Sequence, residues 1–105
     1  YNTPDFAENI VRFIGAAIGE DNIFESEPVM GGEDFGRYGR VEPKIPTFLF
    51  WLGASSKEIW EESIAGNIDL PGIHSPYFAP DPKPTLKTGI NAMTAAAMGV
   101  FNGNK

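Results

Sequence analysis

The feature that most constrains the fold is an uninterrupted apolar segment, Thr47–Leu52, with the sequence Thr-Phe-Leu-Phe-Trp-Leu. Large aromatic and aliphatic side chains occupy consecutive positions, so a strand formed here would be apolar on both faces. Such strands lie in the interior of sheets that helices cover on both sides. The segment therefore predicts an α/β fold with a layered helix–sheet–helix architecture.

The two ends of the chain supply predicted helices for these layers. Apolar residues recur at helical spacing over residues 6–18. Thr3 and Pro4 suit the start of this helix, and Gly19 suits its end. A second helix is predicted from about Thr85, with an apolar stripe along one side. The members of this stripe are Leu86, Ile90, Met93, Ala97 and Phe101.

Shorter elements are expected between the two helices. Ile23–Glu27 is predicted as a strand that Pro28 closes, because proline cannot donate to a ladder. A short helical piece is expected at Glu33–Tyr38, and one or two helical turns around Ile59 and Ile64. Two strands make a poor sheet by themselves. We therefore expect the 105 residues to be part of a larger domain.

Composition and charge exclude several classes of function. The chain has 8 basic and 14 acidic residues, a formal charge of −6, and no cluster of Lys and Arg. Binding to nucleic acid or to an anionic membrane is therefore not expected. Cysteine is absent, which removes disulfides, thiolate zinc sites and thiol nucleophiles. The longest apolar run, Phe48–Leu52, is far shorter than the ~20 residues that span a bilayer.

The single histidine, His74, is the first candidate for a metal ligand. A metal site needs three or four converging ligands, and no second histidine stands at ligand spacing from it. Spacing alone therefore favours a histidine that forms a hydrogen bond in a loop. One histidine for all the serines of the chain, without a nucleophile-elbow motif, also makes a serine triad a poor hypothesis.

The segment Gly31–Phe35 is the second candidate site. Its glycine pair could present backbone N–H groups to an anion, but the carboxylates of Glu33 and Asp34 would repel phosphate. As neighbours on a helix the two acids point about 100° apart, so they are not a paired-carboxylate dyad. The residues alone favour a tight turn with positive φ at glycine, in which the acids stabilise the start of a helix.

Four motifs, taken in their order, carry a resemblance to a known family. They are Val29–Phe35, the apolar segment ending in Leu52-Gly53, His74–Phe78, and the helix start Leu86–Gly89. Together they resemble the metal-dependent amidohydrolases of the hippurate hydrolase and indole-acetyl-amino-acid hydrolase family. Carboxypeptidases and N-acyl-diaminopimelate deacetylases are related branches. The opening Tyr1-Asn2, followed by a helix, resembles the point where such chains return from an inserted lid domain.

The resemblance implies that residues 1–105 are the C-terminal segment of a zinc-peptidase-like catalytic domain. The whole enzyme would hold two divalent metal ions, zinc or manganese-like, and would form a homodimer through the lid domain. His74 matches the metal ligand that the family supplies late in its sequence. Gly32, Glu33 and Asp34 match a loop that lines the substrate pocket. No catalytic residue of the family is expected in this segment.

The expected function is hydrolysis of an amide bond in an N-acyl amino acid or small peptide, as in aminoacylases and carboxypeptidases. The isolated segment would be inactive, because the other metal ligands and the general base lie elsewhere. A cytoplasmic location is favoured. The alternative is a non-catalytic interaction or regulatory module that uses the same fold.

Overall fold

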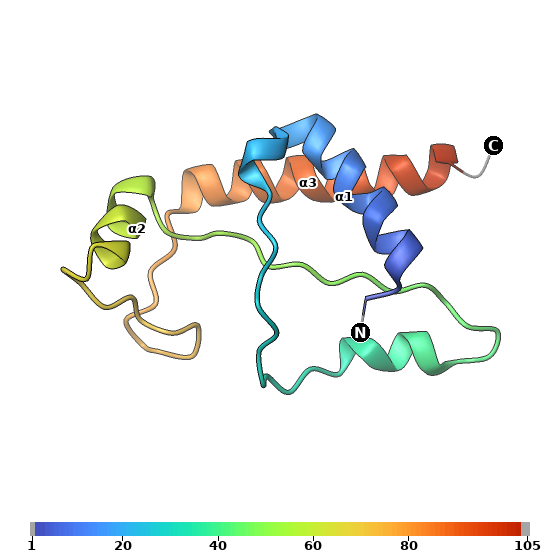
Figure 1. Ribbon diagram of the computed structural model, residues 1–105, viewed down its shortest axis with the longest axis horizontal. Coiled ribbons are helices and arrows are strands. Elements are labelled where there is room, and N and C mark those ends of the chain that lie inside the picture. Colours follow the sequence, from blue (N-terminus) through green and yellow to red (C-terminus); the bar gives the residue numbers. More distant parts are fainter. Residues whose placement is uncertain (1, 104–105) are drawn as a thin grey trace. The chain divides into compact units, whose positions relative to one another are not determined.

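The computed structural model describes residues 2–103, which contain three α-helices and two 3-10 helices (Figure 1). These residues form two compact units. Unit 1 contains residues 2–51 with 90–103, and unit 2 contains residues 52–89. The last helix contributes to both units. In chain order the elements are α1 (Pro4–Ile18), η1 (Glu20–Asn22), η2 (Phe35–Arg40), α2 (Lys57–Ile64) and α3 (Pro82–Gly103).

Helix α1 confirms the predicted first helix. Pro4 occupies the first turn, where its missing N–H costs no hydrogen bond. Gly19 follows the last turn with a φ of 91°, a value that favours glycine. One side of the helix is buried, with Ile10 and Ile14 only 3% and 5% exposed. Local signals at both ends and one apolar face were therefore enough to define this element.

The core of unit 1 is built by α1 and the C-terminal part of α3. Ala92 joins Ile10 and Ile14 in one buried cluster. Gly99 lies so close to the ring of Phe13 that a β-carbon at this position would overlap the ring. Small residues on α3 thus permit a close approach of the two helices. The partly buried side chains around this core are Phe6, Phe13, Ile18, Ile23, Phe48, Phe50, Ala96 and Val100.

The predicted last helix is confirmed as α3, but the apolar stripe predicted along it does not face the core. The side of α3 that faces the core carries small residues, Ala92, Ala96 and Gly99. The prediction followed the largest side chains, whereas close helix packing selects the side with the smallest ones. The helix also begins at Pro82, before the expected start at Thr85. The members of the predicted stripe are all exposed: Leu86, Ile90, Met93, Ala97 and Phe101.

The predicted α/β fold is also wrong, because residues 2–103 contain no β-strand. Ile23–Glu27 is not a strand in the structure, and Phe24 within it is 83% exposed. Thr47–Leu52 lies outside regular secondary structure as well. High β-propensity produces a strand only where a second segment offers a continuous row of hydrogen bonds. Such a row is missing in the described part of the chain.

A short clamp to the N-terminus takes the place of sheet pairing. Thr3 N donates to Thr47 O at 2.9 Å, and Thr47 N donates to Thr3 Oγ1 at 3.1 Å. The side-chain amide of Asn2 makes two hydrogen bonds to the backbone of Leu49. Its Nδ2 donates to Leu49 O at 2.9 Å, and its Oδ1 accepts from Leu49 N at 2.8 Å. The helical turn that begins at Pro4 then carries the backbone away. This turn limits the pairing to two residues, too few for a sheet.

Unit 2 is built from α2, the loop after it and the first part of α3. The helical turns expected around Ile59 and Ile64 are confirmed, and Ser56 caps them by accepting a hydrogen bond from Ile59 N at 3.4 Å. Asp81 N donates to Ala54 O at 2.8 Å and so ties the end of this loop to the segment before α2. Residues 52–89 include no buried residue. Local hydrogen bonds, rather than a core, therefore define this unit.

Across residues 2–103, no helix has both the length and the apolar character needed to cross a bilayer.

Candidate functional site

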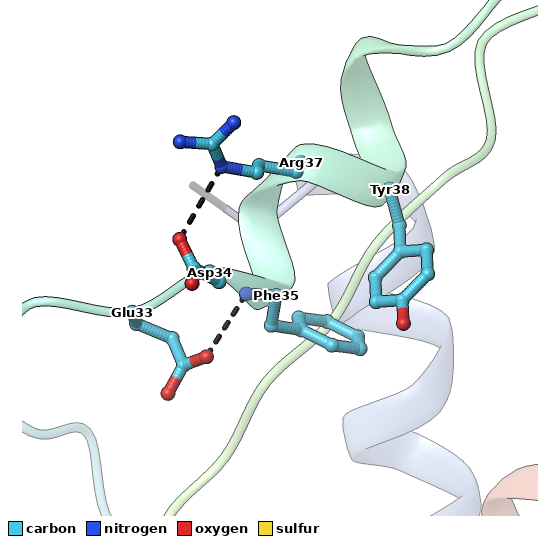
Figure 2. A pocket seen from close by; sticks show the side chains of 5 residues that line it. All are labelled: Glu33, Asp34, Phe35, Arg37 and Tyr38. Atoms are coloured by element: carbon cyan, nitrogen blue, oxygen red, sulfur yellow. Dashed lines mark hydrogen bonds and ion pairs between the residues drawn. The ribbon is translucent and has the colours of Figure 1, made fainter.

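The predicted pocket residues Glu33 and Asp34 line a shallow, open hollow in unit 1 (Figure 2). Three residues of η2 complete it: Phe35, Arg37 and Tyr38. Gly32 stands directly before the hollow and is exposed. Neither Gly31 nor Gly32 has a positive φ, so the tight glycine turn expected from sequence is wrong. Asp34, the residue directly before η2, already has helical backbone angles, with φ −86° and ψ −13°.

Hydrogen bonds fix the acidic side of the hollow. Glu33 Oε1 accepts a hydrogen bond from Phe35 N at 2.9 Å, which satisfies one free N–H at the start of η2. Asp34 Oδ1 accepts from Arg37 Nε at 3.3 Å, with the two side chains 94% and 81% exposed. An ion pair this exposed contributes little to stability. Its effect is to orient the guanidinium of Arg37.

An aromatic pair forms another side of the hollow. The rings of Phe35 and Tyr38 lie edge to face, with centroids 5.6 Å apart and planes at 60°. The two residues are three positions apart, and in a 3-10 helix this spacing places side chains one above the other. Phe35 is half-buried and Tyr38 is 63% exposed. The hollow therefore combines two carboxylates, one guanidinium and two ring edges.

The predicted metal ligand, His74, lies in unit 2 within two consecutive turns. The first turn is closed by Ser75 N donating to Gly72 O at 2.9 Å, and it places His74 at a central position. The second is closed by Phe78 N donating to Ser75 O at 3.0 Å, with Pro76 at the position that proline prefers. The side chain of Ser75 also accepts from Tyr77 N at 3.2 Å. His74 is exposed, so its ring is accessible.

One imidazole does not make a metal site. In the part of the chain that the structure describes, no group of three or more His, Asp and Glu residues lies close enough together to hold a metal ion. Structural and catalytic zinc sites use at least three protein ligands. The described residues therefore fit a single ligand, His74, and not a complete metal centre.

Sequence reasoning found part of the hollow and missed the rest. Glu33 and Asp34 were predicted as pocket residues, whereas Arg37 and Tyr38 were not. A signal for them exists in the sequence, because Phe-Gly-Arg is followed at once by Tyr-Gly-Arg over residues 35–40. This repeat of three matches the period of a 3-10 helix. The hollow and His74 lie in different units.

Comparison with known proteins shows similarity to N-acetyldiaminopimelate deacetylases from several bacteria. The chain is 32% identical over 94 residues to an N-acetyldiaminopimelate deacetylase of Bacillus pumilus, and 31% identical over 94 residues to that of Bacillus subtilis. Each match covers 90% of this chain and 20% of the relative. An N-acetyldiaminopimelate deacetylase of Ligilactobacillus salivarius is 34% identical over 84 residues, or 78% of this chain. These relatives are amide hydrolases.

The comparisons confirm the coarser part of the resemblance. The matched relatives are deacetylases, the branch that the sequence motifs placed beside hippurate hydrolases and carboxypeptidases. The chain spans about a fifth of their length. No family model matches the chain, and no solved structure matches it. The metal ions, the lid domain, the homodimer and the cytoplasmic location stay predictions.

Proposed function

We propose that the protein carrying this segment hydrolyses the N-acetyl amide bond of an amino acid of the diaminopimelate type. The observation that carries the proposal is similarity over nine tenths of the chain to N-acetyldiaminopimelate deacetylases. Because the segment spans only a fifth of those enzymes, it supplies part of the machinery. Its own contribution has two components, one in each unit.

In unit 2, His74 supplies one ligand to a divalent metal ion. The support is its match to the family's late histidine, together with an exposed ring on a loop that two turns and Pro76 hold in shape. A loop of this kind keeps the direction of the imidazole constant, which metal binding requires. Metal ions in such a site would supply an activated water for attack on the amide carbonyl.

In unit 1, the hollow beside η2 contributes to the substrate pocket. Gly32 leads the chain into the hollow, and Glu33 and Asp34 line it. Both acids are engaged by hydrogen bonds from neighbouring residues. Their role is therefore to shape the pocket and to set its charge, and not to carry out proton transfer.

The test is a kinetic and metal analysis of the full-length protein. Purified protein should release acetate from N-acetyldiaminopimelate, whereas the 105-residue chain alone should not. His74→Ala should lose one metal equivalent by mass spectrometry and lose most of the activity. The matched control is Ile73→Ala, which changes an exposed neighbour in the same turn and should retain metal and activity.

Three outcomes would contradict the proposal. A full-length protein that releases no acetate from any N-acyl amino acid would favour the non-catalytic module instead. Full metal content in the His74→Ala variant would remove this histidine from the metal site. Equal losses in Ile73→Ala and His74→Ala would show that the shape of the turn, and not the imidazole, is what matters.

A further inference from the structure

Helix α3 has one side that packs against α1 and another side that remains exposed. Within unit 1 the helix contributes residues 90–103. Its small residues Ala92, Ala96 and Gly99 face α1. A different side, about 17 Å long, carries four exposed residues at helical spacing, and the three large ones are each more than half exposed. We call this side the outer face of α3: Ile90, Met93, Ala97 and Phe101.

The outer face lacks the charges that a helix side in water normally carries. Residues 88–103, more than four helical turns, contain no Asp, Glu, Lys or Arg. Helix α1 of the same unit provides the comparison, because its exposed side carries Asp5, Glu8 and Arg12. The outer side of α1 therefore suits contact with water, whereas the outer face of α3 suits contact with an apolar surface.

The chain also exposes more surface than its size accounts for. Two compact domains with the sizes of unit 1 and unit 2 would together expose about 7,000 Å², whereas the chain exposes 8960 Å². Among the described residues, the buried hydrophobic side chains are limited to Ile10, Ile14 and Ala92. An additional area of about 2,000 Å² is therefore available to a partner.

The size of this area favours a partner larger than a second copy of the chain. A dimer interface of standard size covers about 800 Å² on each subunit, which is less than half of the additional area. The matched segment spans 20% of the length of its relatives, so a parent polypeptide of that length has ample further chain to cover it. A partner on the same polypeptide is also present at a high effective concentration.

We propose that the outer face of α3 is an intramolecular interface, against which the remainder of the parent polypeptide packs. The surface that meets it is apolar and uncharged, because a charge placed against Met93 or Phe101 would lose its water without gaining a partner. The two sides of α3 then have separate roles, since the small side holds unit 1 together and the outer face joins it to the rest of the protein. This inference goes beyond the proposed function, because it concerns assembly and not the reaction.

Two methionines of α3 permit a test on the unaltered full-length protein. Met93 lies on the outer face, whereas Met98 lies on the side of Asn91 and Asn102, and both methionines are similarly exposed in the chain. Peroxide oxidises methionine at a rate that follows its exposure. Mass spectrometry with peptide fragmentation gives the rate at each residue, first in the native protein and then in the unfolded protein.

The expected result is selective protection of Met93. In the native full-length protein, Met93 should be oxidised at least about tenfold more slowly than in the unfolded protein, and Met98 less than about threefold more slowly. The protection of Met93 should not change on dilution, because an interface within one polypeptide does not depend on concentration.

A pair of lysine variants provides a second measurement. Met93→Lys should lower the thermal midpoint of the full-length protein by several degrees, because it places an unpaired charge in the interface. Asn91→Lys is the matched control, since it introduces the same side chain at an exposed position on another side of the same helix. This control should leave the midpoint nearly unchanged, and equal losses in the two variants would contradict an interface on the outer face.

Three results of the oxidation experiment would overturn the inference. Equal rates at Met93 in the native and the unfolded protein would show that the outer face stays in water. Protection that disappears on dilution, as light scattering shows a dimer becoming a monomer, would assign the face to a second copy. Protection that requires added phospholipid vesicles would assign it to a lipid surface. None of these measurements uses turnover, so a failure of the proposed function would leave the inference to be decided by them.

Discussion

The two units of the chain are held together in different ways. Unit 1 contains every buried hydrophobic residue of the described chain, Ile10, Ile14 and Ala92, and one buried polar residue, Thr47. Unit 2, over residues 52–89, contains none, and its shape comes from turns, a capped helix and single hydrogen bonds. Burial makes folding cooperative, whereas local hydrogen bonds open one at a time. Changes in unit 1 should therefore act on the whole unit, and changes in unit 2 should stay local.

The chain offers a separate fluorescent reporter for each unit. Trp51 belongs to unit 1 and Trp60 to unit 2. Replacing one of the two by phenylalanine leaves a signal from the other unit alone. These single-tryptophan proteins separate the response of one unit from the response of the other.

The largest effect should come from Ile10→Ala. This residue is 3% exposed in the core of unit 1, and truncating a buried isoleucine costs about 3 kcal/mol from lost burial and cavity formation. Urea unfolding followed by Trp51 should show a lower midpoint, while the Trp60 signal should not move. The control is Val11→Ala, at an exposed position of the same helix. A shift of both reporters would show that the two units unfold together.

Gly99→Ala should have the second largest effect. A β-carbon at this position would overlap the ring of Phe13, and overpacking of this kind costs about 1–3 kcal/mol. Gly103→Ala is the control, because its β-carbon would lie an ordinary 3.9 Å from Phe13 Cζ. Thermal unfolding by circular dichroism compares the two. A Gly99 variant as stable as the Gly103 variant would contradict close packing of α1 on α3.

Asn2→Ala should have a smaller effect, again in unit 1. It removes both hydrogen bonds between the Asn2 amide and Leu49, at 2.8 and 2.9 Å. The groups left behind are exposed and water can replace the lost partner, so the cost is about 1 kcal/mol. Hydrogen exchange should become faster at the Leu49 amide and stay unchanged in the middle of α1. Unchanged exchange at Leu49 would contradict the clamp.

The smallest effect should come from lowering the pH, which should weaken helix α2 in unit 2. The Glu58 backbone N–H, and then the Ser56 hydroxyl, donate hydrogen bonds that lower the pKa of Glu58. A lowered pKa in the folded state contributes stability above the ordinary carboxyl pKa, and this contribution is lost as the pH falls through the folded value. The amides of α2 should therefore lose protection from exchange in acid, measured against the intrinsic exchange rate at each pH, with Trp51 unaffected. Ser56→Ala should weaken this pH dependence, and an unaltered dependence would contradict the assignment.

Elements with local signals could be predicted from the sequence, and elements that depend on distant partners could not. Helix α1 has its proline start, its glycine end and one apolar face within 16 consecutive residues, Pro4–Gly19. The apolar segment Thr47–Leu52 has the composition of a strand, but a strand also needs a neighbour, and Asn2 and Thr3 pair with it for only two residues. Its composition therefore misled the fold assignment.

The same distinction applies to the candidate site and to α3. Glu33 and Asp34 could be found because they stand in a motif. Arg37 required the local fold, because the helical turn that begins at Phe35 brings it to Asp34 and into the hollow. On α3, the large side chains predicted the wrong face, since the position of Phe13 opposite Gly99 depends on a contact between helices far apart in sequence. Patterns of size within one helix do not contain that information.

The period of η2 has a consequence for how this segment can vary in length. Each residue of a 3-10 helix turns the chain by about 120°, so one inserted or deleted residue before Gly39 would rotate a side chain into the position that now faces Thr47. An insertion would place Tyr38 opposite Thr47, and a deletion would place Arg40 there, so a large side chain would collide with the threonine in both cases. Glycine would then occupy a surface position that now carries a larger side chain. Insertions and deletions within residues 35–40 should therefore be tolerated only in whole triplets.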